Sequence, residues 1–369
     1  MVEHSWSDKL DSWFTYSTAK IVVVRDYRLG ATYYSALLLI VVYIIYNAIA
    51  TGSYLDKAVP TAGSVRASAK LSSSITVPDY CTPGPFNPDG CLYWTADQIV
   101  FPFSGEANSI FISTRVSISS TGPPAAGCDS FINSTLVGCR APTTAALVKK
   151  VYYVANVEDL TFQLDHSIRY QNTLAYGSTS GLQTVSSQNM KGSLLKGCTG
   201  NPGDSLIDMD DAFRARMRAT YNTSLDVVTF GQLMTSAYCG KRTFSMNDIS
   251  DADGAKPGES LRSSGFIVSM PIFYQNRQDL SSVDSLKYRY IPAIVAGSEM
   301  KLFQTIQNAD GSMTYVDRHG IRVIFAQTGT VGTFNFLALV LNLVAALALI
   351  KVASLVVDTL MVYFLPRSY

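Results

Sequence analysis

The chain has 369 residues, a formal net charge of +1 and only 15% charged residues, against 47% hydrophobic ones. A charge this close to zero is atypical of proteins that bind nucleic acid, and so few charged residues are unusual for a soluble protein. We therefore expect a lipid bilayer and no nucleic acid among its partners.

The first predicted membrane helix is the apolar run at residues 31–50 (ATYYSALLLIVVYIIYNAIA). A helix of about 20 apolar residues crosses the hydrocarbon core of a bilayer, and tyrosines favour its boundaries. Residues 1–30 precede this run as a tail that carries several lysines and arginines. This positive charge predicts a cytoplasmic tail.

Residues 51–327 form one large predicted ectodomain. All six cysteines fall in it: Cys81, Cys91, Cys128, Cys139, Cys198 and Cys239. An even number on one side of a membrane indicates disulfides in an oxidising compartment. Six cysteines allow about fifteen pairings. Sequential pairing (81 with 91, 128 with 139, 198 with 239) is favoured only because these cysteines are close along the chain. Two glycosylation sequons, at Asn133 and Asn222, also predict an extracellular or lumenal domain.

The ectodomain is predicted to be rich in β-structure. Alternating or β-branched runs predict strands at residues 109–118, 151–154, 160–164, 266–274, 286–291 and 321–326. One helix is expected at residues 210–220, and loops at 121–127, 176–187 and 251–264. His4, His166 and His319 are scattered and expected at the surface. Without a catalytic motif or a metal-ligand cluster, we expect no enzyme activity and no cofactor.

The second predicted membrane helix, with the segment that leads into it, occupies residues 328–365, before a cytoplasmic tail at 366–369. Its apolar run contains Asn342, Lys351 and Asp358, which are costly in lipid and usually face protein or water. Helical periodicity places a small, weakly polar stripe apart from the charged residues. A pore lining and an ordinary anchor explain this helix equally well. The residues of the candidate pore and gate are Leu341, Asn342, Ala345, Ala348 and Leu349.

Six segments carry a family resemblance: 16–20 (YSTAK), 64–70 (SVRASAK), 94–102 (WTADQIVFP), 108–115 (NSIFISTR), 158–161 (EDLT) and 320–334 (GIRVIFAQTGTVGTF). Asn342, Asp358 and Tyr363 follow at matching offsets. In these segments the chain resembles the ionotropic purinergic receptors, which are trimeric cation channels opened by extracellular ATP. Both ends match specifically, whereas residues 122–264 match poorly.

The resemblance implies a homotrimer with two transmembrane helices per subunit, a disulfide-bonded β-rich ectodomain and ATP bound between subunits. It implies a non-selective channel for Na⁺, K⁺ and Ca²⁺, with ATP as ligand. Thr18 and Lys20 match a regulatory motif in the tail. The residues expected to bind ATP are Lys70, Thr161, Lys301, Arg318 and, as an alternative to Lys301, Arg289.

This chain departs from the family pattern at several positions. Ser68 replaces the first of two binding lysines, and Asp317 stands where the family has a lysine, with Arg318 beside it. A bulge ahead of Gly320 could turn Arg318 into the site; otherwise Asp317 faces the phosphates. A non-conducting accessory subunit of a lipid-flipping pump, with two spans and a glycosylated ectodomain, is the alternative function. The plasma membrane and an intracellular vacuolar membrane are both open.

Overall fold

A computed structural model describes residues 27–59, 62–71, 77–102, 108–123, 126–128, 148–172, 181–195, 205–238, 244–276 and 286–364. The chain divides into two compact units. One comprises residues 1–54 and 336–369, and the other comprises residues 55–335. The predictions at Thr18, Lys20, Asn133, Cys139, Cys198 and Cys239 lie outside the described residues.

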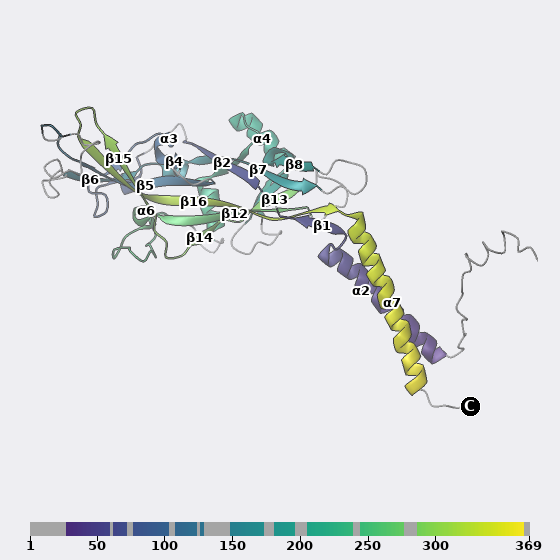
Figure 1. Ribbon diagram of the computed structural model, residues 1–369. Coiled ribbons are helices and arrows are strands. Elements are labelled where there is room, and N and C mark those ends of the chain that lie inside the picture. Colours follow the sequence, from purple (N-terminus) through teal and green to yellow (C-terminus); the bar gives the residue numbers. More distant parts are fainter. Residues whose placement is uncertain are drawn as a thin grey trace, which may run out of the picture. The chain divides into compact units, whose positions relative to one another are not determined.

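The first unit contains two long helices, α2 (Tyr27–Thr51) and α7 (Phe336–Phe364), which pack against each other (Figure 1). Each has a window apolar enough to cross a membrane, Gly30–Asn47 in α2 and Phe336–Thr359 in α7. Apolar side chains are exposed on both helices, including Leu38 and Leu39 of α2. A helix with exposed apolar side chains all round needs lipid or further protein around it.

The second unit is built on a large sheet to which twelve of the described strands belong. Its path runs β10–β9–β13–β12–β16–β5–β6–β3, while β1 and β15 pair with β16, β14 with β12, and β4 with β5. The strands are β1 (Leu55–Ala58), β3 (Cys91–Leu92), β4 (Val100–Pro102), β5 (Ser109–Ser120), β6 (Val148–Val154), β9 (Lys191–Leu195), β10 (Ser205–Met209), β12 (Phe266–Gln275), β13 (Lys287–Tyr290), β14 (Ala293–Val295), β15 (Lys301–Gln307) and β16 (Met313–Phe334).

A smaller sheet contains β2 (Ala62–Lys70), β7 (Thr161–Asn172), β8 (Gly181–Ser186) and β11 (Asp226–Thr229), with the order β11–β7–β2 and β8 paired to β7. One face of β7 presents Phe162, Leu164 and Ile168 to the core, where they join Val268 and Val323 of the large sheet. The hydrophobic core therefore includes residues of both sheets.

Short helices and 3-10 turns complete this unit: η1 (Asp79–Cys81), α3 (Ala96–Ile99), η2 (Val157–Asp159), η3 (Ser187–Asn189), α4 (Asp211–Tyr221), α5 (Phe230–Ala237) and α6 (Leu261–Ser264). The helix predicted at 210–220 is confirmed as α4, because Asp210 accepts a hydrogen bond from the Phe213 amide (2.8 Å) and Asn222 ends the helix in the left-handed region (φ 52°). Asn222 is exposed.

Two loop predictions were partly wrong. Residues 181–186, inside the loop expected at 176–187, form strand β8 because their backbone pairs with β7. Residues 261–264, at the end of the loop expected at 251–264, form the buried helix α6. Gly and Ser content indicated turns but could not show that these segments pair or pack with distant parts of the chain.

Strand β16 extends to Phe334, so residues 328–334, which were grouped with the second membrane helix, lie in the sheet. Helix α7 begins at Phe336, directly after this strand. Earlier in the chain, β16 passes close to strand β5 at Gly320, where a Cβ atom would lie 2.0 Å from the carbonyl oxygen of Ile112. Only glycine allows this approach.

Cys81 and Cys91 form a disulfide, one of the three pairings named above. Cys128 is also disulfide-bonded, and its partner lies outside the described residues. The two-helix, β-rich and disulfide-bonded architecture expected from the sequence is confirmed.

Candidate functional site

Lys70 and Thr161 lie directly opposite each other on neighbouring strands. Lys70 ends β2 and pairs with Thr161, the first residue of β7, which in turn pairs with Thr229 at the end of β11. Side chains of directly opposed residues point to the same face of a sheet. Lys70 is exposed and Thr161 half-buried. Among the described residues, none forms an ion pair or hydrogen bond with the Lys70 side chain.

The chain just ahead of Thr161 is held by a buried arginine. Arg262, 1% exposed, donates to Glu158 of η2, and its guanidinium lies 3.5 Å from the centre of the Tyr80 ring. The Tyr80 hydroxyl donates to Glu158 Oε2 (3.1 Å) and accepts from the Asn156 amide (2.9 Å). Burial, and secondly the Glu158 charge, raise the pKa of Tyr80, so it remains a donor. These contacts fix where β7 begins.

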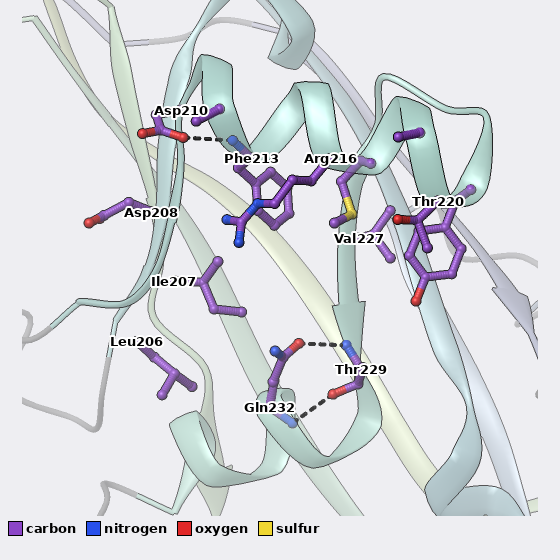
Figure 2. A pocket seen from close by; sticks show the side chains of 14 residues that line it. Leu206, Ile207, Asp208, Asp210, Phe213, Arg216, Thr220, Val227, Thr229 and Gln232 are labelled. Carbon is purple, nitrogen blue, oxygen red and sulfur yellow. Dashed lines mark hydrogen bonds between the residues drawn. The ribbon is translucent and has the colours of Figure 1, made fainter.

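Lys70, Thr161 and Thr229 form a row of opposed residues across β2, β7 and β11. A groove of about 730 Å³ lies beside this row, between α4, β10 and β11 (Figure 2). Thr229 and Gln232 line it and hold each other by two hydrogen bonds at the start of α5. Arg216 also lines it, and none of the described residues pairs with its guanidinium. Because Thr229 is opposite Thr161, the groove adjoins the row that starts at Lys70.

A second surface, on β15 and β16, carries Lys301. Lys301 pairs with His319, and its Nζ lies 3.2 Å from Glu299 Oε1, with both side chains largely in solvent. Asp317, 37% exposed, lies opposite Phe303 on the same pair of strands, and its Oδ2 is 3.7 Å from His319 Nε2. The His319 side chain holds the pKa of Asp317 below its ordinary value. This surface therefore presents one cation next to two carboxylates.

His319 is hydrogen-bonded to Arg115, which belongs to a buried ion pair with Glu259. Glu259, 5% exposed, lies 3.3 Å from Arg115 Nη1 and accepts from the Ser263 hydroxyl (2.6 Å) and the Lys256 amide (2.9 Å). Arg115 Nη2 reaches His319 Nε2 (2.9 Å). Burial alone would raise the pKa of Glu259, but these donors and the Arg115 charge hold it below the ordinary value.

The bulge expected ahead of Gly320 is present as a register shift between His319 and Gly320, but Arg318 lies on the inward side of β16 in the single subunit. Arg318 is 9% exposed, and its guanidinium donates to the Gln98 carbonyl (2.9 Å) and the Ser113 hydroxyl (3.2 Å). It also lies 4.7 Å from the centre of the Trp94 ring. The register shift comes after Arg318 in the chain, so Arg318 keeps the inward side of the strand. Asp317 faces outward instead.

Arg289 and Lys301 lie on different strands of the large sheet. Arg289 is on β13, where it donates to Gln275 Oε1 (2.6 Å), whereas Lys301 is on β15 beyond β12 and β16. Lys70 belongs to the other sheet. These three cations therefore lie on three different strands of the two sheets.

The candidate pore residues of α7 divide into two groups. Asn342 is half-buried in a stripe with Ala346, and its amide donates to the Ser53 carbonyl (2.7 Å) in the turn after α2. Exposed in the single subunit are Leu341, Ala345, Ala348 and Leu349. Because these side chains are exposed, they are available to line a pore or to face lipid. Among the described residues, no ion pair joins Lys351 to Asp358.

His166 and His319 are buried, at 1% and 7% exposure, so the prediction that they lie at the surface was wrong. A signal was present for His166, because Phe162, Leu164 and Ile168 share its period of two along β7. That period indicates the core face of the strand. For His319 the sequence carried no comparable pattern, since its neighbours in β16 mix polar and apolar residues on both faces.

No family model matches the chain. The chain is 33% identical to P2X receptor A of Dictyostelium discoideum over 372 aligned residues, covering 97% of this chain and 88% of that protein. It is 28% identical to P2X receptor E of the same organism, covering 97% and 86%.

Two solved structures share the fold at lower identity. The chicken ATP-gated P2X7 receptor channel with the competitive antagonist TNP-ATP superposes with a TM-score of 0.52 at 14% identity, covering 91% of this chain and all of that chain. A P2X receptor from the Gulf Coast tick, determined with ATP and Zn²⁺, gives a TM-score of 0.50 at 15% identity, covering 89% and 99%.

Proposed function

The chain belongs to the P2X receptor family, and on that premise we propose that it forms a homotrimeric cation channel opened by ATP bound between subunits. The similarity to P2X receptors over 97% of the chain carries this proposal. The ectodomain would face the extracellular space or a vacuolar lumen, and both tails the cytoplasm. None of the relatives described above supports the alternative of an accessory subunit of a lipid-flipping pump.

The proposed ATP site joins the Lys70 surface of one subunit to the Lys301 surface of its neighbour. A triphosphate needs cations that converge on it, and within one subunit these two lysines lie on different sheets. Thr161, opposite Lys70, would donate to or accept from the base. Arg289 is the alternative to Lys301, with the drawback that its guanidinium already donates to Gln275.

The number of available cations suggests a site of modest affinity. A charge-assisted hydrogen bond contributes about 1.5–3 kcal/mol, so two lysines supply roughly 3–6 kcal/mol. Micromolar binding requires about 8 kcal/mol. With Arg318 buried and Asp317 facing outward, we expect half-maximal activation well above micromolar ATP unless contacts to the base provide the difference.

The proposed pore lies on the three-fold axis and is lined by α7. Leu341 and Ala345 are exposed in the single subunit and are the first candidates for its constriction, with Ala348 and Leu349 further along. A ring of three equivalent helices lets one stripe of each face the axis. Asn342 would border this stripe while its amide anchors α7 to the turn after α2.

Whole-cell recording from cells that express this chain alone tests the proposal. ATP should evoke a cation current, and Lys70→Ala should raise the half-maximal concentration at least about tenfold, the low end for losing one charge-assisted bond. Arg66→Ala is the matched control, because Arg66 is an exposed cation on the same face of β2 but lies opposite Asp165. A surface-expressed chain without ATP-evoked current, or equal effects of both substitutions, would contradict the proposal.

A further inference from the structure

A buried polar network joins the two sheets of the ectodomain on the face of β7 that is opposite the Lys70–Thr161 pair. His166 lies on β7, on the face opposite Thr161, and is enclosed by tyrosine rings of β12 and β13. Its nearest ring is Tyr288, with 4.4 Å between the ring centres. Buried polar groups are costly unless they bond each other, so such a network restricts how the two sheets can move.

Gln327 of β16, which is half-buried, joins this network. Its Nε2 donates to the Ser167 carbonyl of β7 (2.9 Å) and to the Tyr274 hydroxyl of β12 (2.9 Å). The Tyr274 hydroxyl, 2.8 Å from His166 Nδ1, then has its own proton free to donate to that nitrogen. One amide group therefore binds both sheets at once.

The protonation of His166 fits this direction of donation. Burial, and secondly the Arg214 charge, lower the pKa of His166 to about 3. The neutral ring accepts at Nδ1 and carries its proton on Nε2, which faces Asp226 Oδ2 at 3.9 Å. Asp226, fully buried, accepts from the Tyr288 and Tyr290 hydroxyls.

Strand β2 meets Gln327 as well. A Cβ atom at Gly63 would lie 2.0 Å from Gln327 Oε1 and 2.5 Å from the Ser167 carbonyl oxygen. Gly63 is near the start of the strand that Lys70 ends, and Ser167 is on the strand that Thr161 begins. Both strands of the proposed ligand surface therefore contact Gln327 at positions away from the Lys70–Thr161 pair, β2 near its start and β7 near its middle.

Strand β16 continues into the second membrane helix. Gln327 lies in the last part of this strand, which ends at Phe334, and α7 begins at Phe336. A displacement of β2 and β7 that moves Gln327 is passed along a continuous backbone to α7. Of the strands that pair with β7, β8 and β11 continue into no membrane helix, whereas β2 follows α2 through β1.

We propose that Gln327, Tyr274 and His166 are positioning residues for gating, which transmit movement of the ligand strands β2 and β7 to strand β16 and so to α7. This inference rests on the proposed function. Its physical content is that the hydrogen bonds of Gln327 hold β7 and β16 as one rigid element, whereas their loss lets β7 move without β16.

The test separates nucleotide occupancy from channel opening. Gln327→Leu removes both donated bonds, and Tyr274→Phe removes a single oxygen atom and keeps the ring. For each variant, the maximal ATP current is divided by the amount of surface protein, and occupancy is followed by photoaffinity labelling with an azido-ATP. We expect maximal current per surface channel to fall about fivefold or more, the usual lower range of coupling between sites, with labelling retained.

Tyr290→Phe is the matched control. It also removes a buried tyrosine hydroxyl of the same cluster, but this hydroxyl donates to Asp226 (2.9 Å) and forms no hydrogen bond with the described residues of β16. It should leave the maximal current per channel unchanged. The double variant Tyr274→Phe with Gln327→Leu should be no worse than the more severe single variant, because both break one path.

The outcomes distinguish this inference from its premise. A wild-type chain that gives no ATP current removes the premise and the inference with it. A responding wild type with normal currents in Tyr274→Phe and Gln327→Leu overturns the inference alone, as does a Tyr290→Phe variant with an equal loss. If Gln327→Leu fails to reach the surface, Tyr274→Phe and Gly63→Ala, which would displace the Gln327 side chain, decide the matter.

Discussion

Replacing Arg318 by alanine should destabilise the ectodomain without a direct effect on ATP affinity. The substitution deletes hydrogen bonds to the Gln98 carbonyl and the Ser113 hydroxyl and a contact with the Trp94 ring. Two charge-assisted bonds at about 1.5 kcal/mol each and a cation–π contact of about 1 kcal/mol sum to roughly 4 kcal/mol. Relief of the cost of burying a charge reduces the net loss to about 2–4 kcal/mol.

Thermal unfolding of the detergent-solubilised protein, followed by fluorescence-detected size exclusion, measures this loss. Arg218→Ala is the control, since Arg218 is exposed on α4 and should change stability by only a few tenths of a kcal/mol. The half-maximal ATP concentration of the Arg318→Ala channels that reach the surface should equal that of the wild type within about threefold. Normal stability with a tenfold loss of ATP sensitivity would show that Arg318 reaches the ligand and would refute the inward placement.

Three further outcomes are expected. Replacing Cys81 and Cys91 together by serine should lower the free energy of unfolding by about 2–4 kcal/mol, measured by denaturant titration, and an unchanged value would argue against a structural disulfide. Because the pKa of Glu259 is depressed in the folded protein, its contribution to stability is present above about pH 4.5 and is lost as pH falls through the folded pKa. Glu259→Gln should reduce this acid-induced loss of stability, measured in unfolding scans from pH 6 to about pH 3. An unaltered pH profile would contradict this expectation. Cysteine at Lys351 should resist thiol reagents that enter the open pore, because three cations in a narrow cation pore would raise a barrier; rapid modification would place the residue in the conduction path.

The sequence determined the features that depend on neighbouring residues. Two apolar runs predicted α2 and α7, because only a continuous apolar surface of this length suits a bilayer. Helix α4 is capped by Asp210 and Asn222, which lie directly at its ends in the sequence. The disulfide between Cys81 and Cys91 joins residues that are close along the chain. Local patterns report local structure, so these elements were predictable.

Tertiary structure decided which side chains meet. Spacing from Gly320 placed Asp317 at the position of the family's lysine but did not show which of Asp317 and Arg318 faces outward, and that follows from the pairing of β16 with β5. Alternation along β7 could place His166 in the core, but Tyr274, 108 positions away, closes the hydrogen bond with it. Gln327 and Ser167 are 160 positions apart. Such contacts depend on the register between strands that are distant in the sequence. A single sequence does not specify this register, because many pairs of polar residues could face each other equally well.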